Sequence, residues 1–143
     1  MTRGVLAAAL LLASCGPRSS TTSLGASGDI DVSRGFAYEP DGSPQMAAYF
    51  TAHNRGSTAD TLDDVSSPLA ASASVHAHRL QGGMMKMVPA GPLAIAPGDS
   101  IVLAPGGLHV MLELSAGGPA KGASLPSTLQ FRPNGDVPGT WPG

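Results

Sequence analysis

Most histidines and methionines of this 143-residue chain lie in one short stretch of it. They fall on three predicted strands, with His76 and His78 on the first, Met84, Met85 and Met87 on the second, and His109 and Met111 on the third. Thioether sulfur is a soft, neutral ligand, and together with imidazole nitrogen it favours Cu(I) over harder ions. This stretch is therefore a candidate site for a soft metal ion.

The strand expected over residues 108–114 has two different faces. Its aliphatic residues, Val110, Leu112 and Leu114, alternate with His109 and Met111. Since successive side chains of a strand point to opposite faces, the aliphatic set is expected in the core and the His/Met pair on the other surface. Packing in the core therefore does not account for Met111.

The two preceding strands show a similar division. His76 lies opposite the apolar Val75 and Ala77. Residues 81–83 (Gln-Gly-Gly) are typical of a hairpin tip, which would fold residues 84–87 back beside His76. Three strands are thus expected to present His or Met on one surface outside the core. In contrast, Met46 is expected in the core, and His53 is expected to be a solvated polar residue.

Other metals fit this set less well. Zinc sites normally use thiolate, imidazole or carboxylate ligands, and the lone cysteine, Cys15, lies far from the cluster. Calcium and magnesium require clustered oxygen ligands. Blue-copper electron transfer requires a Cys ligand beside two His, so that function is excluded as well.

The spacing carries a further signal. Ten residues separate His76 from Met87, twenty-one separate Met87 from His109, and one separates His109 from Met111. This spacing matches the H-X10-M-X21-H-X-M signature, and the chain resembles the PCu(A)C family of periplasmic copper chaperones. The resemblance runs from about Ile30 to Phe131. It includes Ala48-Tyr49-Phe50, Ser66-Ser67-Pro68, Met85-Lys86-Met87 and residues 105–111 (Pro-Gly-Gly-Leu-His-Val-Met).

The resemblance implies both a fold and a function. The fold is an all-β, Greek-key β-sandwich of the cupredoxin or immunoglobulin-like kind, with the site exposed at one edge. The implied ligands of a single Cu(I) are His76, Met87, His109 and Met111. The ion would pass to a recipient, either a cytochrome oxidase subunit that carries a copper centre or a second copper chaperone.

Two further residues are candidates for auxiliary ligands. His78 faces the same way as His76, and Met85 shares a face with Met87. The chain also departs from the family pattern. It has Ala77 where some relatives have Met, and it carries a lipobox. Residues 133–139 (Pro-Asn-Gly-Asp-Val-Pro-Gly) stand where many relatives have a last regular strand.

Composition supports a small β domain. Gly and Pro are abundant, with 19 and 13 residues, and they disfavour long helices. Short alternating segments with frequent turn residues predict a sandwich or a small barrel. We expect this domain to occupy residues 29–132, with residues 133–143 forming an irregular tail.

The N-terminus has the pattern of a targeting sequence. A basic start and a short apolar run over residues 1–14 are typical of a secretory signal; a buried helix or a short membrane anchor is the alternative. Leu12-Ala13-Ser14-Cys15 resembles a bacterial lipobox, so Cys15 is the expected lipidation site. Residues 15–28 would form a flexible tether. The predicted location is the bacterial cell envelope, anchored by lipid and facing the periplasm.

Several function classes are excluded or disfavoured. A net charge near −2 lacks the basic surface that nucleic acid requires. Carboxylates do not cluster for acid–base catalysis, and Asp60, Asp63 and Asp64 are expected in a solvated loop. No nucleophile–base pair is evident, so an enzyme is not expected.

A monomer is expected. Two alternatives to delivery remain, namely a copper buffer or resistance protein that uses the same site, and a structural lipoprotein without a metal.

Overall fold

The computed structural model describes residues 23–39, 43–116, 119–120 and 122–143. The expected signal segment, Cys15 and the first part of the tether lie outside the described residues. Within the described ranges, no helix is long and apolar enough to cross a membrane.

The described part of the chain contains eleven strands arranged in two antiparallel sheets. They are β1 (Ser23–Ser27), β2 (Ile30–Tyr38), β3 (Gln45–Asn54), β4 (Asp60–Ser66), β5 (Ala70–Gln81), β6 (Met84–Pro89), β7 (Leu93–Ile95), β8 (Ser100–Leu103), β9 (His109–Leu114), β10 (Leu125–Arg132) and β11 (Gly135–Trp141). The larger sheet has the order β1-β2-β3-β9-β5-β6, with β8 pairing the second half of β3. The smaller sheet has the order β11-β10-β4-β7.

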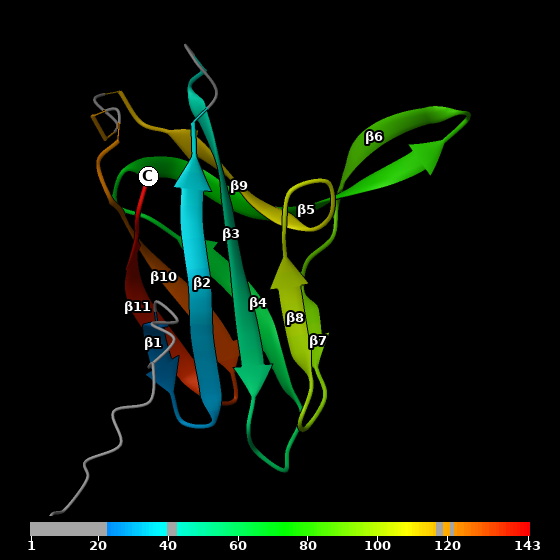
Figure 1. Ribbon diagram of the computed structural model, residues 1–143, viewed down its shortest axis with the longest axis vertical. Helices are drawn as coiled ribbons and strands as arrows, with labels where there is room; N and C mark the ends of the chain where they lie inside the picture. The colour runs from blue at the N-terminus through cyan, green and yellow to red at the C-terminus, as the bar shows by residue number, and fades with distance from the viewer. Residues whose placement is uncertain (1–22, 40–42, 117–118, 121) are drawn as a thin grey trace, which may run out of the picture.

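The two sheets pack as the layers of a sandwich, and the β5–β6 hairpin projects beyond them (Figure 1). The chain crosses between the sheets at the β3–β4, β4–β5, β6–β7, β7–β8 and β9–β10 connections. This is the connectivity of a Greek-key sandwich. The all-β, cupredoxin-like fold expected from the sequence is confirmed.

Alternation of buried and partly exposed residues forms the core. β3 alternates without a break along its ten residues, and Met46 and Phe50 are among its buried members. The prediction that Met46 packs in the core is therefore confirmed. Phe131 from β10 and Trp141 from β11 complete the apolar centre, with the Phe50 and Trp141 rings 5.5 Å apart between centroids.

Both predicted domain boundaries are wrong. Residues 23–27, assigned to the tether, form β1, which pairs with β2 and packs Leu24 against the core. Residues 135–141, assigned to the irregular tail, form β11, which pairs with β10 along its whole length. The last strand, which the sequence predicts to be replaced, is therefore present. β11 tolerates Pro138 because it is an edge strand. The N–H that proline lacks can be one that would face away from the neighbouring strand.

The prediction of a solvated loop is also wrong for Asp60. This residue lies at the start of β4 and is only 2% exposed. Its carboxylate accepts hydrogen bonds from the backbone N–H of Thr61 and from the backbone and side-chain N–H groups of Asn134. Asp63 and Asp64 are exposed, but both lie within β4.

Candidate metal centre

Three neighbouring strands, β9, β5 and β6, carry the candidate ligands on the outer face of the larger sheet. In the β5–β9 pair, His76 lies opposite His109, and Ser74 lies opposite Met111. In the β5–β6 pair, His78 lies opposite Met87. Residues directly opposite each other share a face, so the whole set is presented on one side. The other side of β9 supplies Val110 and Leu112 to the core.

The hairpin that brings β6 to this face turns on Gly82 and Gly83. Gln81 pairs with Met84, so the loop between the strands has only these two residues. Both glycines have positive φ, at 59° and 78°, which is the conformation that a two-residue turn of this kind requires.

His109 is the most enclosed of the candidate ligands, with 3% of the residue exposed. Its Nδ1 lies 3.1 Å from the backbone oxygen of Gly107. A carbonyl oxygen can only accept, so Nδ1 must carry the proton and donate it. The lone pair of the neutral ring is then on Nε2. A hydrogen bond of this kind commonly fixes the tautomer of a metal-binding histidine.

Met87 faces that lone pair. Its Sδ lies 3.0 Å from Nε2 of His109, although half of Met87 is exposed. With the proton on Nδ1, both facing atoms are acceptors, and no hydrogen bond joins them. With bond lengths near those of Zn²⁺, about 2.0 Å to nitrogen and about 2.3 Å to sulfur, a tetrahedral ion would separate its N and S ligands by about 3.5 Å. A small outward movement of Met87 therefore makes room for a shared cation.

The two histidines of β5 both lie near His109. The ring centroids of His76 and His109 are 6.0 Å apart, and those of His78 and His109 are 5.0 Å apart. Nε2 of His76 lies 3.3 Å from the hydroxyl of Ser74. Nδ1 of His76 is buried and has no hydrogen-bond partner among the described residues.

Met111 and Met85 are placed by register. Met111 is half-buried between Ser74 of β5 and Ala47 of β3. It follows His109 on the same face of β9, about 7 Å further along the strand. Met85 pairs with Leu80 near the tip of the hairpin, and 62% of it is exposed. The structure thus brings His109 and Met87 into contact with His76 and His78 beside them, whereas Met85 lies further out.

The electrostatics of the site favour the neutral form of His109. Burial is the main cause of a lowered His109 pKa; the nearby His78 and His76 lower it further, and the hydrogen bond to Gly107 opposes the shift. A neutral imidazole is the form that binds a metal.

Aromatic side chains that sequence reasoning missed flank the centre. The Tyr49 ring centroid lies 6.5 Å from that of His109 and 4.9 Å from that of Phe36. Burial, and then the charge of Tyr38, raises the pKa of Tyr49. The sequence contained a signal for this neighbour, because Tyr49 alternates with the buried Ala48 and Phe50 and must face outward.

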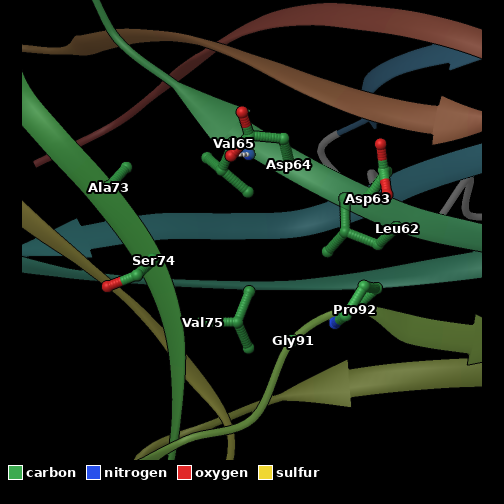
Figure 2. Close-up of a pocket in the computed structure, with 9 residues that line it drawn as sticks. All are labelled: Leu62, Asp63, Asp64, Val65, Ala73, Ser74, Val75, Gly91 and Pro92. Atoms are coloured by element: carbon green, nitrogen blue, oxygen red, sulfur yellow. Dashed lines mark hydrogen bonds between the residues drawn. The ribbon is translucent and has the colours of Figure 1, made fainter.

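Other parts of the surface do not offer a competing centre. Among the described residues, no three His, Cys, Asp or Glu side chains are grouped to hold a metal ion. A hollow of about 240 Å³ between β4 and β5 is lined by Leu62, Asp63, Asp64, Val65, Ala73, Ser74, Val75, Gly91 and Pro92 (Figure 2). It contains neither His nor Met. In the part of the chain that the structure describes, a site with three or more ligands would therefore need thioether sulfur.

The sequence of this chain matches a known protein family. A family profile described as "Putative lipoprotein LpqE-like" matches residues 30–142. The protein belongs to the LpqE-like family. This LpqE-like protein is also similar to solved PCuAC domains, as its sequence motif predicted. A search against curated proteins finds no match.

Three solved structures share the fold of the LpqE-like protein. The apo PCuAC domain from PmoF1 has a TM-score of 0.68 and 28% identity, covering 82% of this chain and 94% of its own. The copper-bound PCuAC domain from PmoF2 has a TM-score of 0.66 and 24% identity, covering 81% and 92%. Apo-DR1885 from Deinococcus radiodurans has a TM-score of 0.58 and 22% identity, covering 99% and 95%.

Proposed function

We propose that this LpqE-like protein is a metallochaperone that binds one Cu(I) through His76, Met87, His109 and Met111. The observation that carries the proposal is the contact between Nε2 of His109 and Sδ of Met87. In the tautomer favoured by the Gly107 hydrogen bond, two lone pairs face each other, and a cation held between them after a small outward movement of Met87 would turn this repulsion into attraction. One of the two atoms is a soft sulfur, which selects Cu(I) among the common ions.

The exposure of the ligands suits a carrier better than a storage site. His109 is buried in the sheet, whereas Met87 is half exposed on a hairpin that leaves the body of the molecule. A partner can approach from the Met87 side and replace the ligands one at a time. Because all four ligands are neutral, the bound ion keeps its charge and attracts an incoming thiolate.

The relatives support the same function. The PCuAC domain from PmoF2, which has the same fold, is copper-bound. We extend the proposal to the recipient, which would be the copper centre of a cytochrome oxidase, reached directly or through a second copper chaperone. We also propose an envelope location with a lipid anchor on Cys15, supported by the lipobox in the sequence.

The test is anaerobic competition for Cu(I) between the purified protein and a chromogenic Cu(I) chelator. Met87→Ala should weaken binding by more than about tenfold, because losing a direct ligand costs at least as much as losing one of its supporting contacts. Met84→Ala is a matched control, since Met84 lies on the same hairpin with its side chain exposed, and its strand partner is Gln81. Binding by the control should equal that of the wild type.

The outcomes separate the rival functions. If Met87→Ala binds Cu(I) as tightly as Met84→Ala does, the site is rejected. If the wild type binds no Cu(I), the protein is better explained as a structural lipoprotein. One equivalent bound, but never released to a copper-free oxidase subunit or another copper chaperone, would favour a buffer or resistance protein.

A further inference from the structure

We propose that His78 is a transfer ligand, which replaces His76 on the copper ion and moves the ion from the sheet to the exposed hairpin. This inference rests on the proposed function and adds a route by which the ion enters and leaves. It assigns to one residue a role that the four-ligand motif does not contain.

The register of the hairpin is the first observation. His78, not His76, is the residue of β5 directly opposite Met87, while His76 is opposite Pro89. His78 is also exposed, whereas His76 is half-buried. His78 therefore lies beside the exposed thioether and on the solvent side of the site.

The ring spacing is the second observation. Two imidazoles on one tetrahedral ion have centroids about 5 Å apart when each metal–nitrogen bond is about 2.0 Å long. The His78–His109 centroids are 5.0 Å apart, close to this spacing, whereas the His76–His109 centroids are 6.0 Å apart. Among the described residues no three His, Cys, Asp or Glu are grouped to hold a metal ion, and this agrees with His76 and His78 binding the ion in turn.

The exchange step is simple. The bond from copper to His76 breaks as the bond from copper to His78 forms, while His109, Met87 and Met111 stay attached. Both imidazoles are neutral, copper remains Cu(I), and neither electrons nor protons are transferred. The ion is then held mainly by groups at the edge of the sheet, where a partner or a chelator can reach it.

A transfer ligand has a specific kinetic signature. It lowers the barrier between the bound and free states without being the main ligand of the stable complex. Its removal should therefore slow capture and release by the same factor and leave the dissociation constant unchanged. A resident ligand would behave differently, because its removal weakens binding and speeds release.

The experiment is stopped-flow transfer of Cu(I), in both directions, between the protein and the chelator bicinchoninate under anaerobic conditions. His78→Asn should slow both rates by about tenfold, the factor that corresponds to a barrier change of about 1.4 kcal/mol. His53→Asn is the control, because His53 is another accessible histidine, bonded to Ser100 at 2.8 Å. It should match the wild type. His76→Asn supplies the comparison for a resident ligand.

The proposal is overturned if His78→Asn changes neither rate, or if it weakens affinity as strongly as His76→Asn does. In both cases a wild type that holds Cu(I) would leave the proposed function intact. A wild type that holds no Cu(I) would reject the two proposals together. Equal slowing in both directions at unchanged affinity is the supporting result.

Discussion

Replacing Trp141 with Ala tests whether the last strand closes the core. The side chain is 1% exposed, and its ring lies against Phe50 with a centroid separation of 5.5 Å. Removing a buried Trp side chain costs about 4 kcal/mol. Since small domains unfold with only about 5–15 kcal/mol, this is a large fraction of the total. At about 4 °C per kcal/mol, the Tm should fall by about 15 °C.

Urea unfolding followed by far-ultraviolet circular dichroism measures the change, because Trp141 is the only tryptophan and its fluorescence is lost in the variant. Thr140→Ala is the matched control, since Thr140 is the exposed neighbour on the same strand. It should change stability by less than about 0.5 kcal/mol. A loss below about 1 kcal/mol for Trp141→Ala would refute the reasoning that β11 is a structural part of the domain.

Two further predictions concern buried polar groups. Burial lowers the native pKa of His109, so below the ordinary value of 6.5 the unfolded chain takes up a proton that the native protein resists. The metal-free protein should therefore be fully stable above pH 6.5 and should lose stability as the pH falls towards the lowered native pKa. The loss should be smaller in His109→Asn. Urea midpoints of the wild type that do not change with pH would contradict this prediction. Asp60→Ala should cost about 2 kcal/mol, because the Asn134 donors lose a charged acceptor. In the same urea titrations Asp63→Ala, exposed on the same strand, should have almost no effect, and equal losses in the two variants would count against this role of Asp60.

Much of the fold could be predicted because alternation is a local signal. The alternation over residues 108–114 predicted Val110 and Leu112 in the core, and both are fully buried. The Gly82-Gly83 turn was similarly readable, because few other residue pairs adopt two successive positive φ angles.

The two terminal strands could not be predicted, because their reasons lie in distant parts of the chain. Residues 23–27 contain one large apolar residue, Leu24, which is a weak signal, and they form a strand through pairing with β2 and through the packing of Leu24 against the core. Gly139 permits the close approach of β1 to β11, since a Cβ at that position would lie 2.9 Å from the Leu24 carbonyl oxygen. The same glycines and prolines that suggested an irregular tail are compatible with an edge strand.

The candidate site was only partly predictable for a similar reason. Alternation showed which side chains face outward, but it could not show which of them lie opposite one another. That depends on register, which places His78 across from Met87 and His76 across from His109. The Gly107 hydrogen bond that fixes the His109 tautomer depends on the path of the β8–β9 loop, and nothing in the residue types indicates it.

The projecting hairpin divides the ligands between two regions of unequal local stability. Within the described ranges β6 pairs with β5 alone, so its backbone hydrogen bonds can open without disturbing the core that holds His109. An ion shared by Met87 and His109 would tie the two regions together, since binding only to the closed form stabilises that form. The bound ion would thereby slow amide hydrogen exchange along β6. The copper-loaded and copper-free proteins would then differ in how often the β5–β6 hairpin opens.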